Sequence, residues 1–529
     1  MYHIITMTNE KFEGYQYNRC SSRGICSINP ATASFQEIIL LNLKYMAYYG
    51  LKLDECGTKD KKISNLILNT LSVLSSNYEI SAMNFELINS AFRKEFPRVI
   101  KEFSDICPGY EKPETDSILQ KDAELNDYIR YGEKEFNKRM QTLSDVERNL
   151  YMILFVLIKS LCINILTYES FGAEADDEII LIYRVLNLLN TPSVQKGELK
   201  KYVSELAESD CNLMKKLHAI QEETYGEQEE KEVSFSTDKG KAILVVGSNL
   251  KELEMILDVF EGKDIDIYTH DNMILAHTFP AFNRYKNLKG QFGQGMENCL
   301  LDFSTFPGPI ILTRYSLFNV ESLYRGILYT TDFSYSKGVI QIKNNDFSDV
   351  IKSTEKSRGF KTGKVCESDK IGFSQTKIMT TIKAKIAEGK YEHIILAGTG
   401  GYSAEEKEYF KSFIEHVPSD VLVVSLFCCK QKENVICINA LNDVLAMNTL
   451  FDKVLKTFSQ KITLIFPYTS RHVLSVIINS AKRENVNVYV GKWTSSVMKQ
   501  GIIESLKSEF GVNGVTVPKN DMNNITDVK

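Results

Sequence analysis

Two histidines stand in one short segment of the sequence, among apolar and acidic neighbours. His270 and His277 lie within residues 268–280, which read Tyr-Thr-His-Asp-Asn-Met-Ile-Leu-Ala-His-Thr-Phe-Pro. Neutral imidazole is a common ligand of transition metals, so this segment is a candidate metal site. A hydrogen-bonded histidine of the protein core is the alternative, and the sequence leaves both interpretations open.

Cysteines form a second group of candidate ligands. The chain has 11 of them, none in a Cys-x-x-Cys pair, and the closest groupings are Cys20 with Cys26, and Cys428 and Cys429 with Cys437. An odd number spread over a long chain indicates reduced thiols rather than a disulfide framework. The first residues show no basic region followed by an apolar run, so we expect a cytoplasmic protein.

A glycine-rich turn is the third candidate site. Residues 398–401, Gly-Thr-Gly-Gly, follow an apolar run and precede a helical pattern. Backbone N–H groups in such a turn can bind phosphate. The segment lacks the full dinucleotide fingerprint and the lysine of a P-loop, which favours a tight structural turn.

The elements that must position these residues fall into two classes. Residues 1–225 show helical periodicity, with helices expected at 31–50, 63–75, 82–96, 144–170, 176–190 and 196–224. From residue 238 onward, short apolar runs alternate with helical segments, which is typical of parallel sheets covered by helices. We predict an α+β multidomain protein with an all-helical domain of two bundles at 1–225, a solvated linker at 226–237, and two α/β domains at 238–375 and 376–529.

Charge and composition exclude several classes of partner. The 529 residues carry 63 basic and 68 acidic side chains, a net charge of −5. This balance gives no broad attraction for nucleic acid or for an anionic membrane. Residues 150–166 are the most apolar stretch, but they are short for a bilayer span and contain Lys159, so we expect a buried helix.

Several segments together resemble the hybrid cluster protein family, also called the prismane or hydroxylamine reductase family. The resemblance implies a helical N-terminal domain and two Rossmann-like domains. It also implies an iron–sulfur cubane near the N-terminus and an iron–sulfur–oxygen hybrid cluster between domains, which reduces hydroxylamine or nitric oxide. The segments that carry it are 222–226 (Glu-Glu-Thr-Tyr-Gly), 247–250 (Gly-Ser-Asn-Leu), 268–280, 303–310 (Phe-Ser-Thr-Phe-Pro-Gly-Pro-Ile), 346–351 (Asp-Phe-Ser-Asp-Val-Ile) and Gly372.

The family's cluster ligands are mostly replaced in this sequence. Of the seven hybrid-cluster positions, six lack the family's histidine, glutamate or cysteine, and only Cys428 retains a thiolate. Near the N-terminus, Cys20 and Cys26 match the second half of the family's four-cysteine motif, and two cysteines cannot hold a cubane in the usual way. The seven positions are Ser248, Asn272, Ser316, Gly400, Cys428, Leu441 and Thr469.

The vacated site suggests two interpretations. In the first, large side chains such as Tyr315, Phe427 or Leu441 fill it. In the second, Arg314 and Arg471 hold a small anion or metabolite. The polar residues expected to line the cleft are Asn272, His277, Glu297, Asn298, Arg314, Ser316, Cys428 and Arg471.

Three functions follow from these patterns. The first, which we favour, is a degenerate family member that binds a protein partner or a small metabolite and carries no cofactor. The second is an iron–sulfur oxidoreductase that reduces hydroxylamine or nitric oxide with a remodelled cluster. The third is an unrelated enzyme that uses the vacated cleft.

Overall fold

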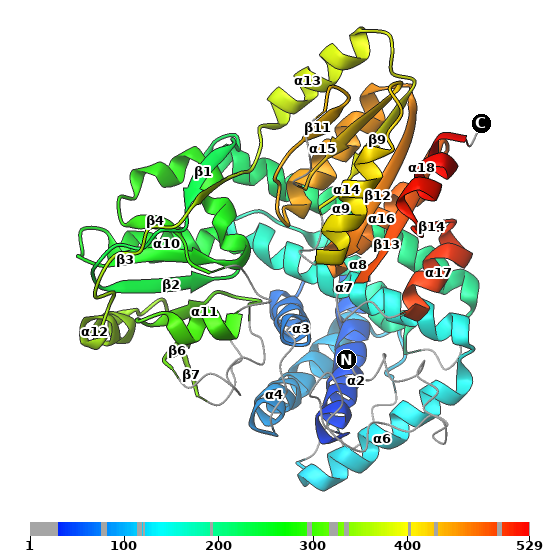
Figure 1. Ribbon diagram of the computed structural model, residues 1–529. Coiled ribbons are helices and arrows are strands. Elements are labelled where there is room, and N and C mark those ends of the chain that lie inside the picture. The colour runs from blue at the N-terminus through cyan, green and yellow to red at the C-terminus, as the bar shows by residue number, and fades with distance from the viewer. Residues whose placement is uncertain are drawn as a thin grey trace. The chain divides into compact units, whose positions relative to one another are not determined.

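The computed structural model divides the chain into two compact units (Figure 1). The first unit comprises Met1–Asp210, Phe333–Lys337 and Lys499–Ser505, and the second comprises Cys211–Asp332, Gly338–Met498 and Leu506–Lys529. The structure describes residues 30–75, 82–113, 119, 122–190, 194–293, 299–316, 326–332, 338–399, 404–427, 432–494 and 500–527.

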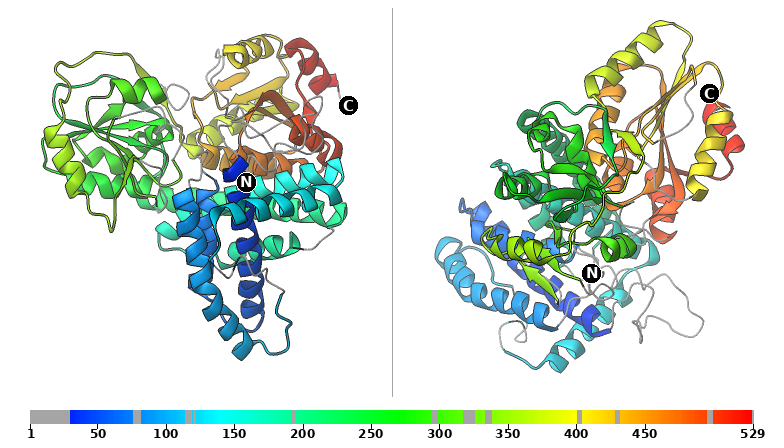
Figure 2. Two further views of the ribbon diagram at one scale, coloured as in Figure 1. Left: turned by 90° about the horizontal axis from the view of Figure 1, so that it is seen from below. Right: turned by 60° about the vertical axis from the view of Figure 1, so that its left-hand side comes forward.

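The first unit is helical, as the periodicity predicted. Helix α2 is buried along most of its length and lies beside α4 (Figure 2). The rings of Phe35 in α2 and Phe85 in α4 stack with centroids 4.3 Å apart. Its helices are α2 (Pro30–Glu55), α3 (Lys61–Val73), α4 (Ala82–Ile106), α6 (Leu125–Thr142), α7 (Asp145–Ser170), α8 (Asp176–Leu188) and the first half of α9 (Lys196–Tyr225).

Helix α7 is the apolar helix expected at 144–170. A capping box begins it: the Glu147 carboxylate accepts the Ser144 backbone N–H at 2.8 Å, and the Ser144 hydroxyl accepts the Glu147 N–H. Such reciprocal bonds satisfy donors that a helix start leaves unpaired. The helix is long and apolar enough to cross a membrane, yet 89% of its apolar window is buried inside the protein. It is therefore the core helix of this unit.

A disulfide in the first unit differs from the reduced thiols expected. Cys56, just after α2, and Cys107, just after α4, are joined as a disulfide with their Cα atoms 6.2 Å apart. The two residues are 51 positions apart in the chain, so sequence spacing gave no signal for the pair. Their proximity follows from the packing of α2 against α4.

The second unit holds two parallel sheets, which confirms the predicted fold class. The first sheet has the strand order β4-β3-β2-β5-β6-β7. Its strands are β2 (Ala242–Val246), β3 (Asp266–His270), β4 (Leu288–Gln291), β5 (Ile310–Leu312), β6 (Leu328–Thr330) and β7 (Val339–Gln341). The connections contain α10 (Leu250–Phe260), the 3-10 helices η1 (Asp271–Thr278) and η2 (Pro280–Arg284), and α11 (Cys299–Thr305), and α12 (Ser348–Lys356) follows β7.

The second sheet repeats the same topology, with the order β11-β10-β9-β12-β13-β14. Side chains of α14 and α18 pack on one face of it, and Phe451 of α15 meets Phe466 on the other. The strands are β9 (His393–Ala397), β10 (Val421–Ser425), β11 (Val435–Cys437), β12 (Lys461–Thr469), β13 (Val486–Thr494) and β14 (Asn513–Gly514). The helices are α13 (Gln375–Ala387), α14 (Ala404–Glu415), α15 (Val444–Thr457), α16 (Arg471–Ala481), α17 (Gln500–Phe510) and α18 (Pro518–Asp527).

The segment expected to be a solvated linker, 226–237, is structured. It contains β1 (Lys231–Ser234), which pairs antiparallel with β8 (Ser368–Ile371). Just before β1, Gln228 is buried and donates from Nε2 to Thr278 Oγ1 at 3.0 Å and to Asp443 Oδ2 at 2.8 Å. The charge run therefore contains one buried amide, whose hydrogen bonds connect a residue of the first α/β half with a residue of the second.

Candidate functional site

Both parallel sheets reverse their direction of winding at one point. In the first sheet this point lies between β2 and β5, and in the second between β9 and β12. Ligands of open α/β sheets bind beyond the carboxyl ends of the strands at such a reversal. We call residues 247–249 and 313–316 the first switch point, and residues 398–399 and 469–472 the second switch point.

The first switch point is closely filled. Gly247 has φ +127°, and a Cβ there would collide with the hydroxyls of Thr313 and Ser316. Thr313 Oγ1 donates to the Val246 carbonyl at 2.8 Å and lies 3.2 Å from Ser316 Oγ. Ser316 is buried, whereas Ser248 is exposed. The two buried hydroxyls thus bond each other and the strand end.

A buried carboxylate closes the same end of the first sheet. Glu252 of α10 accepts the backbone N–H of Arg314 at 2.9 Å and the Thr331 hydroxyl at 2.6 Å. The Nε of Arg314 lies 3.0 Å from Glu252 Oε1. Burial raises the pKa of Glu252 despite these partners. Arg314, predicted to hold an anion, is paired with this carboxylate.

Sequence reasoning missed Glu252, although a local signal marks it. The side chain of Asn249 caps α10 by accepting the backbone N–H of Glu252 at 3.1 Å. An acidic residue in a first helical turn ordinarily faces the helix N-terminus and solvent. Its pairing with Arg314 joins positions far apart in the sequence, and only the fold brings them together.

His270 ends β3 and is fully buried. Its Nε2 lies 3.1 Å from Asp302 Oδ2, and its ring meets Phe303 edge to face at 5.3 Å. Its Nδ1 has no hydrogen-bond partner among the described residues. The next residue, Asp271, has φ +60°, and burial raises its pKa to about 6. Asn272 follows, partly buried, at the start of η1.

His277 is a hydrogen-bonded core histidine. Its Nε2 lies 3.1 Å from the hydroxyl of Thr269, which also donates to Gln291 Oε1 at 2.7 Å. Burial, with a further contribution from Lys231, lowers the pKa of His277 to about 4. The ring is therefore neutral at physiological pH and belongs to a local hydrogen-bond network.

The second switch point is less completely bonded. Thr399 is buried, and among the described residues its N–H and hydroxyl reach only the thioether sulfur of Met447, at 3.3 and 3.7 Å. Thioether sulfur is a weak acceptor. Across the reversal, Thr469 ends β12, fully buried, and no described residue bonds its hydroxyl. Polar groups at this edge are thus poorly satisfied.

Helix α16 begins directly after Thr469. Ser470 is its N-cap and accepts the Val473 N–H at 3.5 Å, and no acidic residue stands in the first turn. Arg471 donates from Nε to His472 Nε2 at 3.3 Å. Burial and the neighbouring Arg471 lower the pKa of His472 to about 3, so this ring accepts the bond in its neutral form. The helix start carries one fixed positive charge.

Leu441, at a position where the resemblance expects a cluster ligand, packs into apolar surroundings. It contacts a cluster of the buried residues Val233, Ile274 and Ile371. Its backbone has φ +50°. Phe427, another residue expected to fill the site, packs instead against the core of the second sheet, with its ring 4.7 Å from Phe410.

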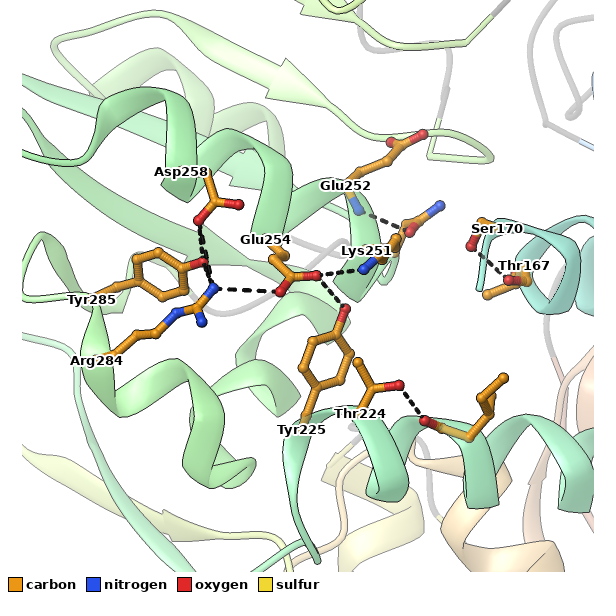
Figure 3. Close-up of polar contacts among 12 residues, drawn as sticks. Thr167, Ser170, Thr224, Tyr225, Lys251, Glu252, Glu254, Asp258, Arg284 and Tyr285 are labelled. Carbon is orange, nitrogen blue, oxygen red and sulfur yellow. Dashed lines mark hydrogen bonds and ion pairs between the residues drawn. The ribbon is translucent and has the colours of Figure 1, made fainter. Parts of the chain in front are cut away.

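A polar network near the end of α9 was also missed (Figure 3). Glu254 of α10 accepts the Tyr225 hydroxyl at 3.1 Å and Lys251 Nζ at 2.8 Å. Arg284 lies 3.5 Å from Glu254 and 3.6 Å from Asp258. Tyr225 also packs on Phe282, with centroids 4.8 Å apart. The network fastens α9 to α10 and η2, so its role is structural.

Several predicted site residues lie outside the described residues. Of the predicted site residues that the structure describes, one group belongs to the first α/β half and the other to the second. The first group is Ser248, Asn272, His277, Arg314 and Ser316, and the second is Leu441, Thr469 and Arg471. The residues not described are Cys20, Cys26, Glu297, Asn298, Gly400 and Cys428.

The described positions do not fit an iron–sulfur–oxygen cluster. Iron in such clusters is held by thiolates, with imidazole or carboxylate at some irons. The described positions offer hydroxyls, one amide and the apolar Leu441, and the hydroxyl of Ser316 is already bonded to Thr313. Within the described ranges, no three His, Cys, Asp or Glu side chains are grouped to hold a metal ion.

Comparisons with known proteins agree on one family. Residues 16–441 match the Prismane/CO dehydrogenase family. The chain is similar to three proteins named hydroxylamine reductase. The one from Thermodesulfovibrio yellowstonii is 23% identical over 96% of this chain and 98% of its own length, and that from Enterobacter sp. (strain 638) is 22% identical over 96% of each. The one from Methanocella arvoryzae is 27% identical over 78% of this chain and 76% of its own.

One solved structure is also similar. It is described as NiZn[Fe4S4] and NiNi[Fe4S4] clusters in closed and open alpha subunits of acetyl-CoA synthase/carbon monoxide dehydrogenase. The match covers 96% of this chain and 84% of that chain, with 12% sequence identity and a TM-score of 0.44.

Proposed function

Because the chain belongs to the Prismane/CO dehydrogenase family, we propose that it is a member that has lost the cluster chemistry and acts by binding a protein partner or a small metabolite. The observation that carries this proposal is the packing of Leu441. Its side chain stands where the resemblance expects a thiolate and lies among Val233, Ile274 and Ile371. An iron atom at that position would have no ligand and would displace an apolar cluster.

The first switch point supports the same conclusion. Thr313 and Ser316 bond each other at the position where the resemblance expects another thiolate. Hydroxyls of this kind are poor ligands for cluster iron, which selects soft thiolate donors. Ser248 and Asn272 supply no imidazole or carboxylate at the remaining positions of this sheet.

A second candidate function is hydroxylamine reduction with a remodelled cluster. The names of the similar proteins from Thermodesulfovibrio yellowstonii and Enterobacter sp. favour it, since both are matched over nearly their whole length. Such a cluster would need ligands at positions other than those of the family.

Iron analysis separates the two candidates. Protein purified strictly without oxygen is assayed for iron, acid-labile sulfide and visible absorption. We expect a colourless, folded protein with less than one iron per chain. A brown protein with several irons and sulfides per chain would overturn the proposal and support the reductase.

A further inference from the structure

We propose that the second switch point binds a small oxyanion, such as inorganic phosphate or the phosphate group of a metabolite, at the start of α16. The residues involved are Thr469, Ser470 and Arg471, with Thr399 on the other side of the reversal. The inference deepens the proposed function and rests on it, because a cluster in the same place would exclude the anion.

The hydroxyl of Thr469 is the first reason. Thr469 is 0% exposed, and its Oγ1 bonds no described residue. A buried hydroxyl without a partner is destabilising, and nearly all such groups bond protein, ordered water or a bound ion. Thr469 ends β12 and immediately precedes the N-cap Ser470, so it belongs to the turn that leads into α16. A ligand oxygen there would accept the hydroxyl proton.

The start of α16 supplies attraction for negative charge. The first N–H groups of a helix lack intrahelical partners, and the helix dipole places partial positive charge there. The first turn contains no acidic residue to compete for these donors. Arg471 adds a full positive charge, and its bond to the neutral His472 orients the guanidinium. An oxyanion at this place would accept charge-assisted bonds from Arg471 and from N–H groups of the first turn.

Thr399, across the reversal from α16, also carries donors that lack a strong acceptor. Its N–H and hydroxyl have the Met447 sulfur as their acceptor, at 3.3 and 3.7 Å. Met447 is unbranched and adaptable, so its thioether can move aside for a stronger acceptor. Thr399 on one side of the reversal has donors with a weak acceptor, and Thr469 on the other has a hydroxyl that no described residue bonds. Donors placed at such a reversal can bind phosphate in α/β sheets.

The test is calorimetric titration of inorganic phosphate into the full-length protein, with chloride balancing ionic strength and iron measured on the same preparation. We expect saturable binding of one phosphate per chain. Arg471→Met and Thr469→Val should each weaken binding about tenfold, since a charge-assisted bond is worth roughly that factor. Thr469→Ser keeps the hydroxyl and should bind like the wild type.

Arg483→Met is the matched control. Arg483 follows the other end of α16 and is paired with Asp452 at 2.6 Å, so its loss changes net charge equally without touching the site. Phosphate affinity should be unchanged, and circular dichroism checks the fold of each variant. Iron-free protein that shows no saturable binding, or binding that Arg471→Met and Thr469→Val leave intact, overturns the anion site alone. Iron-loaded protein overturns the proposed function, and the anion site with it.

Discussion

The two parallel sheets share one topology but end differently at their switch points. In the first, Glu252 pairs with Arg314, and the Thr313 hydroxyl donates to the end of β2. In the second, the described residues offer Thr399 only a thioether acceptor, and none of them bonds the Thr469 hydroxyl. The topology predicts a ligand site at both switch points, and the hydrogen bonds of the side chains determine which switch point has donors available for a ligand. The difference points to the second sheet as the ligand-binding half.

Substituting the glycine that follows the first strand of each sheet should give the largest loss of stability, and the loss should differ between the two switch points. Gly247→Ala should lower the free energy of unfolding by about 4 kcal/mol, because the left-handed φ and the collision with Ser316 add. Gly398→Ala should cost less, about 2 kcal/mol, since its Cβ would lie 3.0 Å from the flexible Met447 sulfur and 3.0 Å from the ring of Phe466, which must shift slightly. Urea unfolding of both variants measures the difference, and equal losses would contradict the contrast.

The buried carboxylate should account for the next largest effect. Glu252→Ala leaves the backbone N–H of Arg314 and the Thr331 hydroxyl without their acceptor and should cost about 3 kcal/mol, whereas the half-exposed guanidinium of Arg314 would be solvated. Glu261→Ala, on the exposed end of the same helix, is the control and should change stability by less than about 0.5 kcal/mol. Thermal and urea unfolding report both values. A similar loss of unfolding free energy in both variants would show that the hydrogen bonds of Glu252 do not stabilise the first switch point.

The dependence of stability on pH should have opposite signs at the two switch points. Burial raises the pKa of Asp271 from 3.8 to about 6, so the native state holds its proton more tightly than the unfolded chain. The resulting stabilisation is complete below about pH 4 and is lost as pH rises through 6. Asp271→Asn should therefore raise the free energy of unfolding by about 2 kcal/mol at pH 7 and leave it unchanged at pH 4.

The second edge supplies the comparison for this titration. The pKa of His472 is lowered from 6.5 to about 3, so the native ring stays neutral between pH 5 and 8 while the unfolded chain takes up a proton as pH falls below 6.5. This residue therefore lowers stability as pH falls, the opposite of Asp271. His472→Gln should raise the free energy of unfolding by about 2 kcal/mol at pH 5 and leave it unchanged at pH 8, as measured by urea unfolding at each pH. The same direction of change with pH for both variants would contradict the assignment.

The smallest expected effect is a change in the free energy of unfolding that has opposite signs at the two switch points. Thr469→Val replaces a buried, unbonded hydroxyl by a methyl group and should stabilise phosphate-free protein by about 1 kcal/mol. Thr313→Val removes the bond to the Val246 carbonyl and should destabilise by about 1 kcal/mol. Chemical unfolding without phosphate gives both signs. Destabilisation by Thr469→Val would indicate that its hydroxyl is already satisfied.

Local patterns were enough to predict the fold class. The helix expected at 31–50 is α2, and the apolar runs at 242–247 and 421–425 are the buried strands β2 and β10. Helix α6 was missed, because few of its residues are apolar and its pattern is weak. The charge run before β1 predicted solvent exposure, but pairing with β8 depends on a segment far along the chain.

The candidate site was predictable only in outline. Strand ends and glycines located both edges, since parallel strands bring their carboxyl ends together. The ion pair of Glu252 with Arg314 could not be predicted, because it depends on how α10 and the turn after β5 meet. Nor does sequence show that Leu441 packs with Val233, which lies more than two hundred residues earlier. The comparisons confirm the family resemblance, whereas the loss of its chemistry stays a proposal.

Anaerobic reconstitution tests the central claim most directly. The purified protein is incubated with ferrous iron and sulfide, desalted, and assayed for bound iron and for hydroxylamine reduction with a chemical electron donor. The account predicts less than one iron per chain and turnover no faster than the reagents alone. Stoichiometric cluster iron together with hydroxylamine turnover would contradict it.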